Sequence, residues 1–132
     1  MGAWVELKLE VLQNESFSYP IYYFGPAPDF TPTDLSGCTV SFSARKAQND
    51  TAELIINLAV GTGLTLVSQA YPTSGEADPS YPNGVSIAMT PAQTEPLAVG
   101  NNWYWDMVAT FPSGVKYYIG RGVFQVTSTA AR

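Results

Sequence analysis

The fold is decided by residues 102–126, which read Asn102-Trp103-Tyr104-Trp105-Asp106-Met107-Val108-Ala109-Thr110-Phe111, then Pro112-Ser113-Gly114, then a second apolar run from Val115 to Val126. Two runs rich in aromatic and β-branched residues, joined by a three-residue Pro/Gly turn, predict a β-hairpin. Because side chains alternate between the faces of a strand, every second residue of the first run falls on one apolar face. That face needs a second layer to cover it. Taken alone, the hairpin predicts a compact all-β domain and does not identify its task.

Six further runs alternate apolar and polar residues, and the whole chain of 132 residues fits a single β-sandwich domain, 1–132. Pro20 lies inside one run and cannot donate a ladder hydrogen bond, so that strand should have an edge or a bulge there. Thr90-Pro91 predicts one helical turn. Seven to eight short strands with frequent turns predict an antiparallel β-sandwich. The expected strands are 5–11, 17–23, 38–45, 54–60, 64–66, 85–89, 102–111 and 115–126.

The predicted core combines the apolar face of the hairpin with a strand that begins after the turn Asp34-Leu35-Ser36-Gly37. In the last strand the alternation changes register, so a bulge is expected at Gly120-Arg121-Gly122. The core residues are Trp103, Trp105, Met107, Phe111, Val40 and Phe42.

The charge balance excludes one large class of partner. Eleven Asp and Glu residues against six Lys and Arg give a net charge of −5, which repels phosphate backbones, so no nucleic-acid partner is expected. Only 13% of the residues are charged, about half the usual share, and this neutral composition favours a chain packed against other proteins, as in a homo-oligomer. No window approaches eighteen apolar residues and the first residues lack a basic region, so neither a membrane partner nor a signal peptide is expected.

The sequence contains few of the residue types that catalysis most often uses. The chain has no histidine and one cysteine, Cys38, which removes the commonest general base and nearly excludes a zinc site. The cysteine is expected to be a small buried residue. Glu76 and Asp78 lack the ligand spacing of an EF-hand. We therefore expect no catalytic residues, no cofactor and no metal, and thus no enzyme.

Asp106 is a charge in the middle of the most apolar hairpin. If Phe111 pairs with Val115 across the turn, Asp106 lies opposite Gly120 and diagonal to Arg121. Partly buried carboxylates are usually paired, so a structural ion pair between Asp106 and Arg121 is expected, with Arg45 as a second candidate partner.

Two long segments, 25–34 and 68–84, have no apolar repeat and many prolines, and the sandwich itself does not need them. They are the expected contact surfaces, with Pro26, Pro28, Phe30, Tyr71 and Tyr81 as the interface candidates.

An aromatic platform that stacks on sugars is the alternative binding site. Trp103 and Trp105 share the inward face, which favours a core role for both. Only Tyr104 and Tyr118 have the outward position that a platform needs.

Three segments in order resemble a group of small tailed-bacteriophage virion proteins. Asp34-Leu35-Ser36-Gly37 opens a strand that ends in Arg45, Leu97-Ala98-Val99-Gly100 precedes the aromatic strand, and Pro112-Ser113-Gly114 returns to Gly122 and Val126. In that group the corresponding segments are an Asp-Leu-Thr-Gly turn, a Leu-Pro-Ala-Gly segment before a Tyr-x-Tyr-Asp strand, and a Pro-Ser-Gly hairpin. The chain is also similar to the N-terminal domain of phage baseplate upper proteins.

The resemblance implies an immunoglobulin-like sandwich that works as a non-enzymatic building block of the virion, in the tail, baseplate, fibre-attachment or head-decoration layer. Its partners would be other virion proteins and further copies of the chain. A carbohydrate-binding module for host-surface glycans is the alternative, and a cell-surface immunoglobulin-like adhesion domain is a third possibility.

Overall fold

The computed structural model describes residues 5–23, 33–47, 53–69, 79–97 and 99–128, and the regular structure in this part of the chain is β-strand apart from one short helix. The interface candidates Pro26, Pro28, Phe30 and Tyr71 lie outside the described residues. The strands are β1 (Val5–Glu6), β2 (Leu9–Leu12), β3 (Phe17–Tyr22), β4 (Thr39–Arg45), β5 (Leu54–Val60), β6 (Gly63–Val67), β7 (Gly84–Met89), β8 (Gly100–Thr110) and β9 (Lys116–Thr127).

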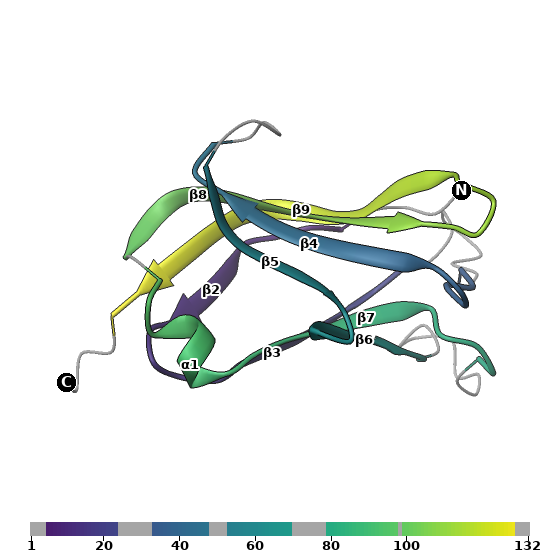
Figure 1. Cartoon of the computed structure of the whole chain (residues 1–132), viewed down its shortest axis with the longest axis horizontal. Coiled ribbons are helices and arrows are strands. Elements are labelled where there is room, and N and C mark those ends of the chain that lie inside the picture. The colour runs from purple at the N-terminus through teal and green to yellow at the C-terminus, as the bar shows by residue number, and fades with distance from the viewer. Residues whose placement is uncertain (1–4, 24–32, 48–52, 70–78, 98, 129–132) are drawn as a thin grey trace.

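The strands form one mixed sheet that folds over itself into two layers. Its order is β1-β9-β8-β4-β5-β6-β7-β3, and β2 also pairs with β9. Figure 1 shows β9, β8, β4 and β5 in the upper layer and β7, β6 and β3 in the lower one. Most neighbours are antiparallel, as expected, but β1 and β2 run parallel to β9, and β5 runs parallel to β6. The expectation of a purely antiparallel sandwich is therefore wrong, and nine strands replace the seven to eight expected.

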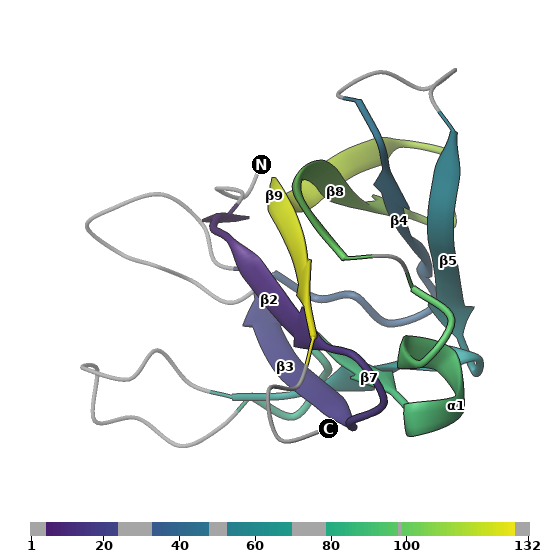
Figure 2. The same ribbon diagram turned by 90° about the vertical axis from the view of Figure 1, so that its left-hand side faces the viewer.

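The extra strand comes from a break in the first predicted strand, 5–11. β1 ends at Glu6 and β2 begins at Leu9, with Leu7 and Lys8 between them. Leu7 stays attached to β9, because its backbone N–H donates to the Arg121 carbonyl at 3.1 Å. The first segment thus lies along β9 in two pieces (Figure 2).

The short helix α1 (Pro91–Thr94) is the predicted helical turn. Thr90 and Gln93 form a reciprocal capping box, in which each side chain accepts a hydrogen bond from the backbone N–H of the other residue. Thr94 is fully buried and its hydroxyl donates to the Glu15 carbonyl at 2.8 Å. This bond ties α1 to the turn between β2 and β3.

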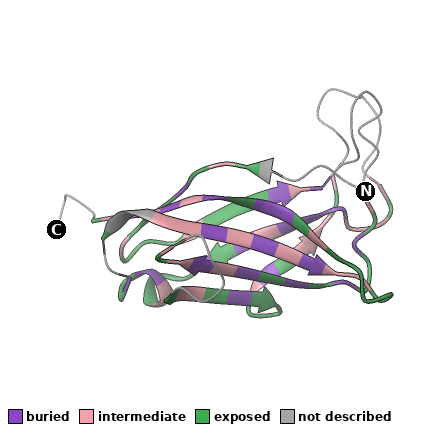
Figure 3. Cartoon of the chain, turned by 90° about the horizontal axis from the view of Figure 1, so that it is seen from above, coloured by how far each residue is buried: buried purple, intermediate pink, exposed green. Residues whose placement is uncertain are grey.

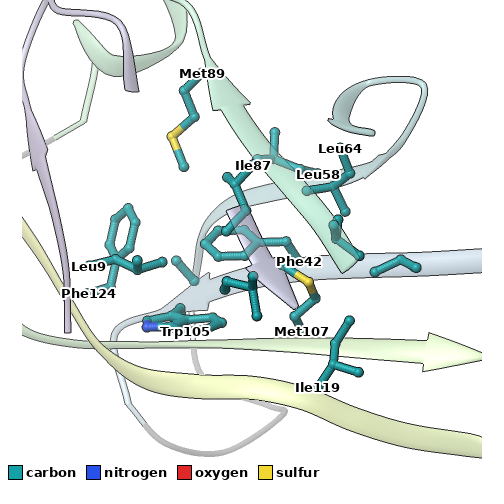
Figure 4. Packing of buried hydrophobic residues seen from close by; sticks show 14 of the residues in the cluster. Leu9, Phe42, Leu58, Leu64, Ile87, Met89, Trp105, Met107, Ile119 and Phe124 are labelled. Carbon is teal, nitrogen blue, oxygen red and sulfur yellow. The ribbon is translucent and has the colours of Figure 1, made fainter. Parts of the chain in front are cut away.

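The core lies between the layers, and Figure 4 shows Trp105 beside Phe42 within it. The Trp105 ring stacks on Phe42 with centroids 5.6 Å apart, and Phe42 meets Phe124 edge-on at 6.3 Å. Of the six predicted core residues, Trp105, Met107, Val40 and Phe42 are buried, whereas Trp103 and Phe111 are half-buried and pack against the core from its margin.

The hairpin of β8 and β9 forms as expected, with the Phe111 N–H donating to the Val115 carbonyl at 2.8 Å. The bulge is nearer the turn than expected. Val108 pairs with Tyr118 but Met107 pairs with Gly120, so Ile119 is the additional residue. Ile119 is fully buried, which gives the displaced residue a place in the core.

Pro20 lies in β3, which stands at the end of the sheet order within the described residues. The prediction of an edge strand is confirmed. An edge position suits proline because one side of such a strand needs no ladder hydrogen bond.

Candidate functional site

The outer face of the β9-β8-β4-β5 layer carries a shallow hollow of about 510 Å³. Figure 3 looks onto this layer from above, where buried and more exposed residues alternate along the strands. We call the feature the Tyr118 hollow, and its side chains of interest are Thr39, Ser41, Val108, Thr110, Lys116 and Tyr118.

Strand pairing brings these residues together from two distant parts of the chain, strand β4 and the β8–β9 hairpin. Thr110 of β8 lies between Thr39 of β4 and Lys116 of β9. One step along the same face, Val108 lies between Ser41 and Tyr118. Side chains directly opposite one another on one face are roughly 5 Å apart at Cβ, so the six form two adjacent rows across three strands.

The hollow combines three kinds of binding group. Tyr118 is 56% exposed, so much of its ring is open to solvent. Thr39 and Ser41 are exposed and Thr110 is half-buried, and each carries a hydroxyl that donates and accepts hydrogen bonds. Lys116 is exposed and supplies the charge among these six residues. This arrangement can stack on an apolar ring face, bond hydroxyls and attract an anion.

Tyr104, the other residue predicted for an aromatic platform, lies in a separate hollow of about 370 Å³ beside Glu6, Lys8 and Val123. Tyr104 is four residues along β8 from Val108, the partner of Tyr118, or roughly 14 Å away. Asp106 lies between them on the same face. Tyr104 and Tyr118 both face outward as expected, but they do not form one continuous platform.

Asp106 occupies the middle of this outer face. The bulge at Ile119 places it directly opposite Arg121, not opposite Gly120 as the unbulged hairpin implied, and Ser43 is its neighbour on the other side. Burial raises the pKa of Asp106, while the charge of Arg45 acts in the opposite direction and is the smaller effect. Arg45 is thus the cation that influences this carboxylate, and the ion pair with Arg121 stays a prediction.

The raised pKa gives Asp106 a testable pH signature. Because the folded pKa lies above the usual 3.8, the stabilising contribution is present in full below that value and is lost as the pH rises through the folded pKa. We expect the free energy of unfolding of Asp106→Asn, relative to that of the wild type, to be higher at pH 7 than at pH 3. Urea unfolding of both proteins at both pH values measures the difference. If Asp106→Asn is instead more destabilising at pH 7 than at pH 3, an ion pair stabilises the carboxylate by more than burial destabilises it.

Asp34→Asn is the matched control with the opposite sign. The Asp34 carboxylate accepts a hydrogen bond from the Ser36 N–H at 2.8 Å, and bonds from Ser36 lower its pKa. The carboxylate of Asp34 therefore contributes to the free energy of unfolding above its pKa in the unfolded chain, and this contribution is lost as the pH falls through its folded pKa. The asparagine variant should therefore lose stability at pH 7 and match the wild type at low pH.

The remaining predicted site residues are dispersed. Tyr81 is half-buried in the segment before β7, away from the outer face of the upper layer. Cys38 is buried, and burial raises the pKa of its thiol. In the described parts of the chain, no three His, Cys, Asp or Glu residues gather as a metal site would require. Nor does any helix within those parts have the length and hydrophobicity to cross a membrane.

Sequence reasoning missed Thr39, Ser41, Thr110 and Lys116 as members of a site. For the three hydroxyl residues the signal is their outward position at alternate places in two strands, and for Lys116 it is the place opposite Thr110 in the predicted hairpin. That signal becomes specific only when β4 is known to lie beside β8.

Comparison with known proteins adds little. No protein-family model matches the chain, and no curated protein matches it. A solved structure of murine CRIg is similar with a TM-score of 0.36 and 11% sequence identity, over 98% of this chain and 97% of that one. A similarity of that size assigns neither a family nor a function.

Proposed function

We propose that the chain is a non-enzymatic structural component of a tailed-bacteriophage virion, acting through contacts with other virion proteins and with copies of itself. We also propose that its sheet is an immunoglobulin-like sandwich of the variable type. The observation that carries the functional proposal is the outer face of the lower layer, formed by β3, β7 and β6, which holds no charged residue among its described positions.

The outward positions of that layer follow from its register. β3 and β6 flank β7. Residues that pair with the buried Val85, Ile87 and Met89 share the inward face of β7, so they do not belong to the outer face. The remaining residues are small, hydroxylated or apolar, and we call them the neutral face: Ser18, Pro20, Tyr22, Thr65, Val67, Ser86 and Ala88.

A neutral face of this width supports burial against another protein. Antiparallel sheets that face water on one side usually alternate apolar residues with polar or charged ones. Interface centres are depleted of charge relative to the rest of a protein surface, because each buried charge must be desolvated. The chain has eleven Asp and Glu residues, and none of them is among the described outward positions of this layer.

The residues that carry the phage resemblance have structural tasks here. Asp34 caps the turn before β4, where Gly37 has a positive φ of 76°. Gly114 closes the β8–β9 turn with a φ of 92°. Such positions favour glycine, because a residue without a Cβ adopts a positive φ at little steric cost. These motifs maintain the fold and position no catalytic group, which supports a structural role for the protein.

The strand order supports the variable-type immunoglobulin arrangement. In such domains a three-stranded sheet is extended at one edge by additional strands, while the other sheet keeps its own set. Here β5 extends the three strands β9, β8 and β4, and β3 and β7 pair in the opposite layer. The first strand lies on β9, which places it at the edge of the larger layer.

A lysine in the neutral face should block incorporation into particles. Ala88 is exposed near the end of β7, opposite Ser18 of β3, so Ala88→Lys should fold normally, yet its ammonium would be buried without a partner in an assembled contact. We expect the variant, supplied to phage lacking the native copy, to be depleted about tenfold or more in purified virions by quantitative immunoblot.

Glu10→Lys is the matched control, because it also introduces a lysine at an exposed strand position, but in β2 and outside the neutral face. It should be incorporated at the wild-type level. Absence of the wild-type chain from purified virions would refute the proposal, and equal incorporation of Ala88→Lys would refute the neutral face as the contact.

A further inference from the structure

The Tyr118 hollow contains groups that the proposed structural role does not use. It lies on the opposite layer from the neutral face, and its residues come from β4, β5, β8 and β9. Three hydroxyls, an exposed tyrosine ring and an ammonium meet there on a surface that is otherwise free of charge at its lining positions.

The ring is the first binding element. An aromatic side chain in the core would be covered, whereas Tyr118 is 56% exposed beside the half-buried Val108. Pyranose rings present an apolar face of C–H groups, which packs on an aromatic ring with a gain beyond simple burial. Tyr118 thus offers a stacking surface about the size of one sugar.

The hydroxyls are the second element. Thr39 and Thr110 are directly opposite one another, and Ser41 is two residues from Thr39 on the same face. Each hydroxyl both donates and accepts, which matches the donor and acceptor character of sugar hydroxyls. A row of such groups beside a ring favours a saccharide over an apolar ligand, which would leave them unpaired.

The third element is Lys116, directly opposite Thr110. It adds a positive charge to a hollow whose other lining residues are uncharged, within a protein of net charge −5. A carboxylate placed at this rim would gain a charge-assisted hydrogen bond that a neutral sugar cannot form.

We propose that the Tyr118 hollow binds a carboxylated saccharide, with one sugar ring stacked on Tyr118, its hydroxyls bonded to Thr39, Ser41 and Thr110, and its carboxylate near Lys116. The site binds and does not cleave. This proposal does not depend on the virion role, because the hollow lies on the layer opposite the neutral face and its binding is measured on the isolated chain.

The test is binding of the purified chain to an array that pairs sialylated and uronic acid-containing oligosaccharides with their neutral counterparts. The wild type should bind carboxylated members and prefer them over the neutral counterparts. Failure to bind any carboxylated sugar would overturn the proposal, as would an equal or greater preference for the neutral counterparts.

Variants locate the binding. Tyr118→Ala should weaken binding about tenfold, whereas Tyr118→Phe keeps the ring and should remain close to the wild type. Lys116→Gln should remove the preference for carboxylated over neutral members. Tyr104→Ala is the control, since it removes an outward tyrosine from the same layer of the sheet, but one that lies in the separate hollow beside Glu6 and Lys8. Loss of binding in Tyr104→Ala with retention in Tyr118→Ala would place the site elsewhere and refute the assignment.

Circular dichroism and thermal unfolding of each variant separate loss of the site from loss of the fold. Virion incorporation of Tyr118→Ala provides the link to the structural role. A variant that is incorporated normally but no longer binds sugar would leave the two proposals independent, as the opposite placement of the two faces predicts.

Discussion

Trp105→Ala should lower the free energy of unfolding by about 4 kcal/mol, and the midpoint of thermal unfolding by roughly 15 °C. Trp105 is 2% exposed, and among the described residues it is the largest of the fully buried side chains. Its removal would leave a cavity between the layers, because the backbone of β8 is held on both sides by β4 and β9 and cannot collapse inward. Urea unfolding monitored by far-ultraviolet circular dichroism measures the change.

The indole also has a polar task. Its Nε1–H donates to the Leu7 carbonyl at 3.0 Å, across the break between β1 and β2. The alanine variant thus loses both the ring contact with Phe42 and a partner of the Leu7 oxygen. Trp105→Phe keeps an aromatic ring but removes the donor, so it should cost about 1–3 kcal/mol.

Trp103→Ala is the comparison that tests the assignment of layers. Trp103 is half-buried at the margin of the core, two residues before Trp105 on the same face. Its loss should cost clearly less than that of Trp105, because solvent already reaches part of the ring. A reversed order of the two costs would contradict the deeper burial of Trp105.

The local features of this fold were predictable because their signals are local. The Pro112-Ser113-Gly114 turn needs only its own three residues and the flanking apolar runs to specify the hairpin. The same holds for α1, where Thr90, Pro91 and Gln93 carry the cap within four positions. Alternation in β4 likewise identified Val40 and Phe42 as buried.

The mispredicted features depend on long-range pairing. Nothing near Leu9 indicates that it pairs in parallel with Phe124. The bulge position is similarly undetermined by the sequence, since Ile119 and Gly120 are both compatible with an extra residue. The one-residue difference decides whether Asp106 meets Gly120 or Arg121.

The candidate site shows the same limit. Thr39 and Lys116 become neighbours of Thr110 only through two separate strand pairings. The sequence identified Tyr118 as outward but could not say which side chains surround it. A binding site assembled from three strands is thus less predictable than the core beneath it, which needs only alternation and apolar residues.

The two proposed roles use opposite faces of one body. Inward residues of β8 and β9, including Trp105 and Ile119, fix the sheet, while their outward neighbours line the hollow. A strand can therefore hold the fold and a ligand at once, because alternation separates the two tasks. The neutral face of β3, β7 and β6 stays available for protein contacts while the Tyr118 hollow is occupied.

The other large effect is expected at Gly122, where a single methyl group should detach the first segment of the chain. Gly122 lies opposite Trp105, and a Cβ at this position would overlap the Leu7 carbonyl oxygen and crowd the carbonyl carbon. These are backbone atoms, so no rotamer change relieves the contact. The Leu7 oxygen is also the acceptor for Trp105, and its displacement would break that hydrogen bond as well.

We therefore expect Gly122→Ala to lower the free energy of unfolding by about 3 kcal/mol or more, with loss of hydrogen-exchange protection at the amides of β2 before the rest of the sheet. Gly114→Ala is the control: a Cβ there meets no atom within 4 Å, and its φ of 92° leaves backbone strain as the cost, about 1–2 kcal/mol. Because Gly122 and Trp105 share the Leu7 oxygen, Gly122→Ala combined with Trp105→Phe should cost less than the sum of the single changes. An additive result would show that the indole bond survives the methyl group, and the crowding at Leu7 would then not be what destabilises the variant.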